Sequence, residues 1–542
     1  MTELSGRRKN HNILPLITLA IFLLPIFTII FSMDASGSEN WIFFKNHLLP
    51  ESFYNTIYLT FMASALAGLL GFLSAYLVNF FEYPLSRFFK WSFVLPMAVP
   101  PYIAGYVYAG MLGYTGNVQI MARQILGYSI PYQYLDIMNL NGAVLIYGFM
   151  LYPYVYLIVR SYLNGSATQW VESSRVLGLG MGETLRRVIL PLSRPSIVMG
   201  TGMVMMEVIS DYGLVKYFGI RTLGTDIFSL WFGSGDLSAA TRVSLILLVL
   251  VISLLLLDTL LKGKKKYHLN VSKSNPIRKM KLKGLTKWSA FAFSIVVMLI
   301  GFVIPVAQLI EWGTKSIGRV DLSALGQMIM NTFKASSIAL VIIVLVTFFL
   351  ARYSAREKGV VARIVDQGVK LGYSIPGAVI GVGVLILFIG LDRSLAPLYQ
   401  WLSLNKSLVI SSSLFVLYFA YASRFLLLGY NSFYSGFMKH GSGYFDSART
   451  LGMSRFKASV KVDVPMQRMA FVSASILIVI DIMKELPLTL MLRPFNYETL
   501  ATKTFEYAND ERLQEAAVPA LIILSISVVG ILVLSNIQKR RK

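Results

Sequence analysis

The sequence of 542 residues has no cysteine and only four histidines, His11, His47, His268 and His440. The absence of cysteine excludes disulfide bonds and thiolate metal sites. The scattered histidines argue against a histidine-based metal centre, and no Ser-His-Asp or paired His/Cys arrangement supports a membrane-embedded enzyme. The chain also lacks a G-x-x-x-x-G-K-[ST] phosphate loop, so we do not expect it to bind ATP itself. We therefore expect no cofactor and assign no metal site.

Apolar residues dominate the composition, at 55% with a mean hydropathy of +0.63. They form continuous blocks, such as 13–31 and 518–534, that are long enough to cross a bilayer, which takes about 20 residues per helix. In lipid only helices and closed barrels satisfy their backbone polar groups. The blocks are continuous rather than alternating, so the sequence predicts an all-α polytopic membrane protein instead of a barrel.

About twelve transmembrane helices are expected. They are 13–33, 55–79, 91–113, 140–162, 196–215, 241–261, 288–310, 332–350, 371–391, 409–428, 468–491 and 516–536. The first block follows Arg7, Arg8 and Lys9 but is not followed by a small-residue cleavage site, so we expect it to be retained as a span.

Basic residues concentrate in alternate loops, and the net charge is +23. The stretch 262–287 contains Lys and Arg but no acidic residue, whereas acidic residues outnumber basic ones in loops 34–54 and 492–515. By the positive-inside rule, both termini are expected in the cytoplasm. We interpret the central basic run as a lipid-facing linker in preference to a nucleic-acid site.

The two halves of the sequence repeat. Asn-Thr pairs occur at 55–56 and 331–332, and proline-containing triplets occur at 99–101 and 375–377. Each half has an even number of expected spans, so the repeats run in the same direction and are related by an axis along the membrane normal. The expected organisation is a first six-helix repeat 1–262, a basic cytoplasmic linker 263–287 and a second six-helix repeat 288–542.

Matching segments lie between the fourth and fifth expected spans of each repeat. Residues 172–191 read ESSRVLGLGMGETLRRVILP, and residues 446–465 read DSARTLGMSRFKASVKVDVP. Within loops 163–195 and 429–467 we expect a cytoplasmic helix-turn-helix. Gly178 and Gly452 sit where a helix would end in a left-handed cap, and the second, basic helix is expected to end at Pro191 or Pro465.

The first helix of each hairpin is expected to carry a narrow, weakly apolar face, because its members recur at i, i+4 and i+7. These faces consist of Trp170, Ser174 and Leu177 in one copy and Tyr444, Ala448 and Leu451 in the other.

Both segments resemble the EAA loop of ABC importer permeases, in which an acidic residue is followed six positions later by glycine and thirteen further on by proline. The departures are mild, with Ser173-Ser174 and Ser447-Ala448 in place of the small-small pair and aspartate for glutamate in the second copy. The resemblance implies a type I importer permease fold and two coupling helices that dock on two separate ATPase subunits. The implied coupling residues are Glu172, Arg175, Gly178 and Pro191, and Asp446, Arg449, Gly452 and Pro465.

Two longer stretches, 206–228 and 484–520, are similar to the corresponding stretches of fused iron(III) permeases. This resemblance extends over essentially the whole chain. It implies a bacterial inner-membrane importer of ferric iron, served by a periplasmic iron-binding protein and needing no second permease chain. Relatives in the wider group carry thiamine, polyamines or phosphonates, and these substrates remain open.

Ionisable residues inside the expected spans are candidates for the translocation pathway, because such residues are rare in lipid and often functional. The candidates are Glu207, Asp211, Tyr212, Asp481 and Glu485. A shift of 274 residues relates the first pair of carboxylates to the second. Carboxylate oxygens suit a hard cation such as ferric ion. The alternative is a structural or gating role, with Lys484 pairing with Asp481 or Glu485.

An ion-driven secondary transporter is the main alternative class, since it can also have twelve spans in two parallel halves. It would not need two matching cytoplasmic hairpins, and the sequence therefore favours the ATP-driven importer.

Overall fold

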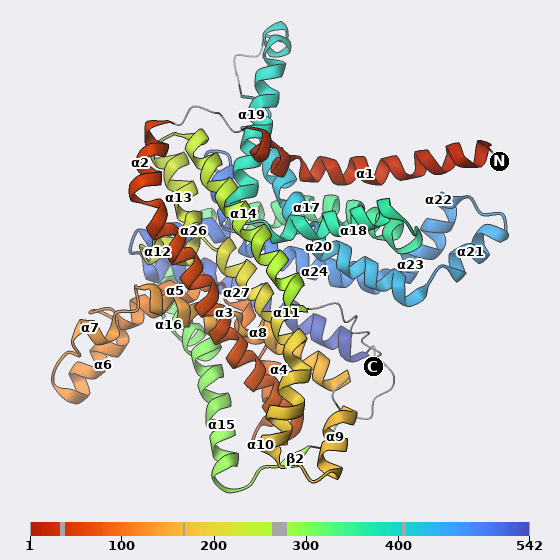
Figure 1. The fold of residues 1–542 in the computed structure, drawn as a ribbon. Coiled ribbons are helices and arrows are strands. Elements are labelled where there is room, and N and C mark those ends of the chain that lie inside the picture. The colour runs from red at the N-terminus through yellow and green to blue at the C-terminus, as the bar shows by residue number, and fades with distance from the viewer. Residues whose placement is uncertain (1, 33–37, 166–167, 263–278, 404–407, 541–542) are drawn as a thin grey trace.

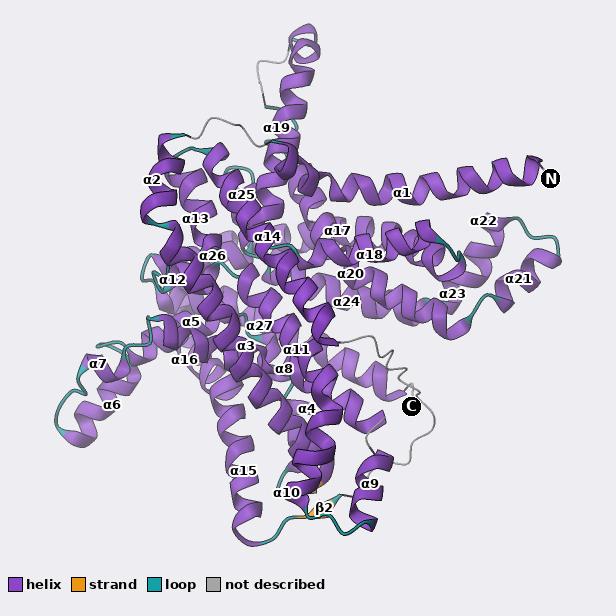
Figure 2. Cartoon of the chain, viewed as in Figure 1, coloured by secondary structure: helices purple, strands orange, loops and turns teal. Residues whose placement is uncertain are grey.

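The computed structural model describes residues 2–32, 38–165, 168–262, 279–403 and 408–540 (Figure 1). Nearly all of these residues are helical, as Figure 2 shows. Within these ranges the strands are β1 (Phe81–Glu82) and β2 (Met280–Lys281), which pair in parallel. Most of the predicted linker, 263–278, lies outside the described residues.

The helices of the first half are α1 (Thr2–Phe31), α2 (Glu39–His47), α3 (Leu49–Phe80), α4 (Ser86–Ser92), η1 (Leu95–Ala98), α5 (Pro101–Leu112), α6 (Asn117–Leu126), α7 (Tyr132–Leu135), α8 (Leu140–Gly165), α9 (Thr168–Val176), α10 (Met181–Thr184), η2 (Leu185–Ile189), α11 (Leu190–Ser210), α12 (Gly213–Tyr217), α13 (Leu223–Phe228), η3 (Ser229–Gly233) and α14 (Leu237–Lys262).

Those of the second half are α15 (Gly284–Met298), η4 (Leu299–Val303), α16 (Ile304–Ser316), η5 (Ile317–Arg319), α17 (Leu322–Arg356), α18 (Val360–Ser374), α19 (Gly377–Trp401), α20 (Leu414–His440), α21 (Gly443–Thr450), α22 (Arg455–Ala458), η6 (Ser459–Asp463), α23 (Val464–Met466), α24 (Arg468–Lys484), α25 (Pro487–Leu492), α26 (Leu500–Asn509) and α27 (Leu513–Arg540).

The described residues contain 10 helices that are long and apolar enough to cross a membrane, or 11 if the bent pair Arg455–Met466 and Arg468–Lys484 counts as one span. The all-α polytopic fold is confirmed. The expected span 91–113 differs, because the structure divides it among α4, η1 and α5. The division occurs at three prolines, since proline provides no backbone donor and clashes with the preceding turn. They are Pro96, Pro100 and Pro101.

The two Asn-Thr pairs make the same contacts in both halves, which confirms the repeat. Asn55 Nδ2 donates to the carbonyl of Arg221 at 2.9 Å, and Asn331 Nδ2 donates to the carbonyl of Glu498 at 3.0 Å. The neighbouring threonines do likewise, with Thr56 Oγ1 accepting from Leu223 N at 3.0 Å and Thr332 Oγ1 from Leu500 N at 2.9 Å. These pairs lie within α3 and α17, not at their starts as predicted.

The first long helix of each half contacts the opposite half. Helix α1 lies along α18 and α19, where Thr28 Oγ1 donates to the carbonyl of Gly383 at 2.9 Å (Figure 1). In the reciprocal contact, Tyr108 Oη of α5 donates to the carbonyl of Ile300 at 2.6 Å, in the helical segment that continues into α16. Helix α1 therefore packs mainly on the second half, whereas α16 contacts α5 of the first half but packs mainly along α27 of its own half.

Candidate functional site

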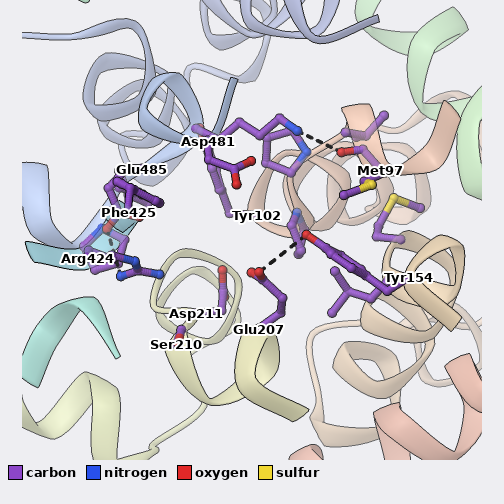
Figure 3. A pocket seen from close by; sticks show the side chains of 18 residues that line it. Met97, Tyr102, Tyr154, Glu207, Ser210, Asp211, Arg424, Phe425, Asp481 and Glu485 are labelled. Carbon is purple, nitrogen blue, oxygen red and sulfur yellow. Dashed lines mark hydrogen bonds and ion pairs between the residues drawn. The ribbon is translucent and has the colours of Figure 1, made fainter. Parts of the chain in front are cut away.

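A cavity lies where interrupted helical segments of both halves meet (Figure 3). Helix α11 ends at Ser210 before α12, α24 ends at Lys484 before α25, and the proline-rich stretch precedes α5. Irregular backbone at membrane depth is tolerated where it is buried in protein or lines a cavity. The cavity is lined by Met97, Val99, Pro100, Pro101, Tyr102, Met150, Leu151, Tyr154, Glu207, Ser210, Asp211, Arg424, Phe425, Asp481, Lys484, Glu485, Leu486 and Pro487.

The first repeat contributes two carboxylates that contact tyrosine hydroxyls. Tyr147 Oη donates to Asp211 Oδ2 at 2.8 Å. Tyr154 Oη donates to Glu207 Oε1 at 3.4 Å, as Figure 3 shows. Asp211 Oδ2 also accepts from the backbone N–H of Leu214 at 2.9 Å. These bonds fix the Asp211 carboxylate at the break between α11 and α12.

The second repeat contributes two carboxylates together with two cations. Arg424 Nη1 lies 3.2 Å from Glu485 Oε1, with both side chains almost fully buried. Lys484 Nζ donates to the carbonyl of Met97 at 2.9 Å, so its bonded partner is neither of the two carboxylates expected from the sequence. Asp481 makes no hydrogen bond or ion pair within the described residues. It differs in this from Asp211 and Glu485, whose carboxylates are held by hydrogen bonds.

Close approach of Arg424 to the backbone requires a glycine at position 377. A Cβ on Gly377 would collide with the Arg424 guanidinium. Pro376 caps α19 immediately before it. The glycine of the triplet 375–377 thus makes room for the buried ion pair.

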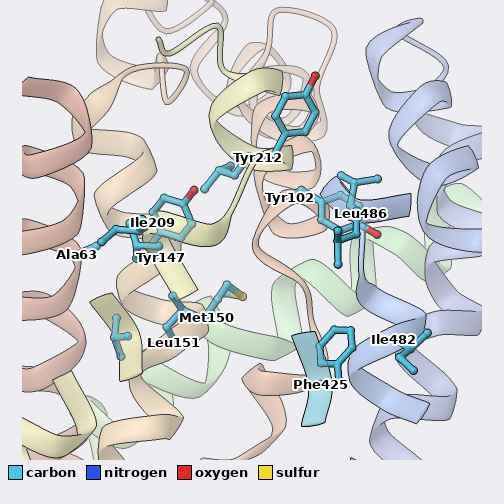
Figure 4. Close-up of a cluster of buried hydrophobic side chains, with 14 of the residues drawn as sticks. Ala63, Tyr102, Tyr147, Met150, Leu151, Ile209, Tyr212, Phe425, Ile482 and Leu486 are labelled. Atoms are coloured by element: carbon cyan, nitrogen blue, oxygen red, sulfur yellow. The ribbon is translucent and has the colours of Figure 1, made fainter. Parts of the chain in front are cut away.

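The structure brings four of the five predicted pathway residues together, and Tyr212 is the exception. The Tyr212 ring stacks on Phe228 at a centroid distance of 3.9 Å and lies among apolar side chains rather than in the cavity lining (Figure 4). The sequence reading missed Arg424 and Tyr154. Arg424 gave a signal, because it is an ionisable residue inside the expected span 409–428.

No group of three or more His, Cys, Asp or Glu residues in the described ranges is close enough to hold a metal ion. The four carboxylates therefore line one cavity without forming such a group.

The two helical hairpins predicted from the sequence are present as α9–α10 and α21–α22. Gly178 and Gly452 follow their first helices with φ of +78° and +82°, which confirms the left-handed caps. Arg175 and Arg449 belong to equivalent turns of α9 and α21. Arg449 donates to the carbonyl of Met453 across the turn.

The expected apolar face of each first helix is divided in the structure. Ser174 and Ala448 are buried within their hairpins, whereas Leu177 and Leu451 are each 80% exposed. The acidic residues Glu172 and Asp446 are also exposed. Each hairpin thus presents an acidic residue and a leucine to solvent.

The prediction that the second hairpin helix ends at proline is wrong for Pro191. Residues Met181–Ser210 form one continuous helical segment, and Pro191 follows the π-turn η2. A π-turn shifts the backbone hydrogen bonds locally, so the helix continues past the proline. Pro465 also follows a π-turn, η6, but there the helix bends by 70° shortly afterwards.

A buried ionic contact links the second hairpin to α17. Asp463 Oδ2 lies 2.9 Å from Arg352 Nε, and Asp463 Oδ1 lies 2.5 Å from Arg356 Nη2. The Arg356 guanidinium also lies 3.8 Å from the centroid of the Phe445 ring in α21. Because Ile189 is the counterpart of Asp463 in the first repeat, the first hairpin cannot form this contact.

Comparison with known proteins identifies the first repeat directly. Residues 67–266 match the family described as "Binding-protein-dependent transport system inner membrane component". Over 492 residues, covering 90% of both chains, the protein is 23% identical to the Fe(3+)-transport system permease protein FbpB 2 of Haemophilus influenzae.

Shorter permeases match part of the chain. The sulfate transport system permease protein CysT of Salmonella typhimurium is 24% identical over 44% of this chain and 84% of its own length. The molybdenum transport system permease protein ModB of Escherichia coli is 26% identical over 36% of this chain and 92% of its own length. The match to the binding-protein-dependent transport family therefore lies in the first repeat, the similarity to a transport permease extends over nine tenths of the chain, and the same backbone contacts recur in the second half.

Proposed function

We propose that this permease forms the translocation pathway for ferric iron, free or chelated, delivered by a periplasmic binding protein. The observation that carries the proposal is the convergence of Glu207, Asp211, Asp481 and Glu485 on one cavity. Two cations, Arg424 and Lys484, line the same cavity, so acidic groups are in excess. Hard cations prefer such oxygen donors. The similarity to a Fe(3+)-transport permease over nine tenths of the chain supports the same cargo.

We further propose that α9 and α21 are coupling helices for two separate ATPase subunits. Each hairpin supplies a docking surface made of an exposed acidic residue and an exposed leucine. These are Glu172 and Leu177 in the first hairpin and Asp446 and Leu451 in the second. With both termini in the cytoplasm, ATP binding draws the two hairpins together and opens the cavity outward to the docked binding protein. Repeats 1–262 and 288–542 then supply both halves of the pore, so one chain per complex suffices.

An oxyanion is the second candidate cargo. The similarity to sulfate and molybdenum permeases, together with Arg424 and Lys484 in the cavity, favours sulfate or molybdate over the cationic thiamine and polyamines, and the similarity alone favours them over phosphonates. Arg424 is already paired with Glu485 and Lys484 with a backbone carbonyl, which leaves little free positive charge for an anion.

Uptake into proteoliposomes that contain the permease, its ATPase and its binding protein tests the proposal. We expect radioactive ferric iron to accumulate only when both ATP and the binding protein are present. Sulfate, molybdate, thiamine, a polyamine and a phosphonate serve as parallel substrates. ATP-dependent uptake of one of these without iron uptake would reject the iron assignment, and uptake without the ATPase would reject the ATP-driven mechanism.

A further inference from the structure

The segment that joins α5 to α8 stands apart from the rest of the helices (Figure 1). Residues 113–135 of this segment, which contain α6 and α7, form the α6–α7 arm. Helix α6 packs mainly against α5, and Asn117 Nδ2 at its start donates to Gln308 Oε1 of α16 at 2.9 Å. The arm and α9 lie at opposite ends of α8, which has 26 residues and is about 39 Å long. This length places the arm on the opposite side of the membrane from the first hairpin.

Polar and apolar side chains of the arm are arranged in the reverse of the order expected in water. Gln119 is 1% exposed, and its amide is satisfied inside the arm, since Nε2 donates to the carbonyl of Ile130 at 2.7 Å and Oε1 accepts from Ile130 N at 3.0 Å. The exposed side chains of α6 are those of Ile120, Met121, Gln124, Ile125 and Leu126. Only the glutamine among them is polar, and Ile125 is 76% exposed. A polar interior with an apolar exterior indicates that the surroundings of the arm are apolar.

The arm carries little charge and several exposed tyrosines. Arg123 is the one charged residue between positions 113 and 135. Its guanidinium lies 5.0 Å from the centroid of the Tyr114 ring and donates to the Tyr114 carbonyl at 3.1 Å. The exposed tyrosines are Tyr114, Tyr128, Tyr132 and Tyr134. Tyrosine is enriched at the boundary between membrane and water, because its ring is apolar and its hydroxyl reaches water.

The second repeat has a corresponding projection at the end of α19. Pro100 and Pro376 cap α5 and α19 at equivalent positions, so α6 corresponds to the last turns of α19. There Asp392 is buried and accepts from Tyr399 Oη at 2.7 Å, whereas Trp401 is 78% exposed. Figure 1 shows the end of α19 and the α6–α7 arm leaving the helix body in different directions. Both repeats therefore project an element whose polar group is buried and whose outer side is apolar.

We propose that the α6–α7 arm lies in the lipid headgroup region, with the exposed side of α6 against the acyl chains. An apolar span, Tyr132–Asn164, begins within the arm, so the arm starts at the membrane boundary. The irregular backbone of residues 127–131 excludes a deeper position, because lipid-exposed loops leave polar backbone groups unpaired in the hydrocarbon. Short amphipathic helices bind at this level of a bilayer. Naming this leaflet as the outer one rests on the proposed coupling function of α9.

Lipid fits this surface better than a protein partner does. A binding protein delivers its cargo and leaves, so an apolar face covered only by that protein would meet water between the two events. Arg123 is already held by the Tyr114 carbonyl and by Ser129 Oγ, so it is not free to select a charged partner surface. Through α5, the bilayer thereby holds Pro101 and Tyr102, which line the cavity.

The test uses the whole permease with its ATPase subunits in nanodiscs. Because the sequence has no cysteine, a bimane label reacts only at an introduced site. The sites are Ile125→Cys in the arm, Ile252→Cys on an exposed side of the span α14, and Asp510→Cys between α26 and α27. We expect phosphatidylcholine with brominated acyl chains to quench the Ile125→Cys label at least half as strongly as the Ile252→Cys label. Iodide in the buffer should quench the Ile125→Cys label at least threefold less than the Asp510→Cys label.

A charge variant tests whether the apolar side of α6 holds the arm in place. Met121→Asp/Ile125→Asp should lower the quenching of a Tyr134→Cys label by brominated lipid at least twofold, and the apolar control Met121→Leu/Ile125→Leu should leave it unchanged. Iodide quenching of the Ile125→Cys label equal to that of Asp510→Cys would overturn the proposal. Shielding that appears only after the binding protein is added would also overturn it and assign this face to that protein. Neither iron nor ATP enters the test, so its failure leaves the proposed cargo untouched.

Discussion

Asp211 and Glu485 hold the same backbone position in the two repeats, and each caps the break that follows its helix. The carboxylate of Asp211 accepts from Leu214 N at 2.9 Å, and that of Glu485 accepts from Leu488 N at 3.1 Å. Their other partners differ, since Asp211 meets a tyrosine hydroxyl whereas Glu485 meets the guanidinium of Arg424. The cavity is therefore symmetric in backbone and asymmetric in charge.

Because Arg424 and Glu485 are buried as an ion pair, we expect the free energy of unfolding to fall when one of the two charges is removed alone. Arg424→Met installs the residue found at the equivalent position 150 and leaves Glu485 buried without its cation. We expect a loss of about 3–5 kcal/mol, because an uncompensated buried charge is costly. Thermal unfolding of the purified protein measures the loss. The double variant with Glu485→Gln should recover most of it, and a double variant as unstable as the single one would contradict this reasoning.

Removing cavity charge should impair transport without impairing ATP hydrolysis. Glu207→Gln and Asp481→Asn are each expected to lower iron uptake about tenfold, which corresponds to roughly 1.4 kcal/mol of lost stabilisation of the cation in transit. Uptake and ATPase rates are measured on the same proteoliposomes. Tyr212→Phe is the control, because its ring packs on Phe228 outside the cavity. Equal losses in all three variants would indicate a structural effect instead.

The left-handed glycines of the hairpins should be essential for coupling. In Gly178→Val/Gly452→Val, a β-branched residue is forced to positive φ at about 1–2 kcal/mol or more per site, which distorts both turns. We expect ATP-dependent uptake to be lost while membrane insertion, measured by fractionation, is retained. Gly180→Ala is the matched control, because Gly180 has φ of −65° and open space around its Cβ position. Normal uptake in the double valine variant would reject the coupling role.

The ionic contact of Asp463 should contribute more to stability than the exposed Glu183–Arg187 ion pair of the first hairpin. Asp463→Asn weakens the attraction to Arg352 and Arg356, so we expect faster amide hydrogen exchange in α21 and a loss of about 2–4 kcal/mol. Glu183→Gln, which removes the exposed pair with Arg187 at 3.5 Å, should change stability by less than about 1 kcal/mol. Similar exchange rates in both variants would show that the buried contact does not hold the hairpin.

Local sequence signals predicted most of the helices, and one span failed for a local reason. The expected span 91–113 counted apolar residues without weighing Pro96, Pro100 and Pro101 together, and these residues divide it. The prediction at Pro191 was wrong in the opposite sense. A helix end was expected there, but the π-turn before the proline lets the helix continue. Proline marks a place where the hydrogen-bond ladder must change, but the neighbouring turn decides whether the helix breaks.

The sequence by itself determined the membrane class, the two-fold repeat, the hairpin glycines and the identity of the four carboxylates. Hydropathy and a glycine cap depend on short segments, and a repeat is found by comparing two segments of the same sequence. None of these requires knowledge of which side chains meet in space. The tertiary structure alone decided the packing of α1 on the second half, the pairing of Arg424 with Glu485, the exclusion of Tyr212 from the cavity and the bend at Gln467. These features depend on which side chains of distant helices meet, and segment-level patterns carry no information about such packing.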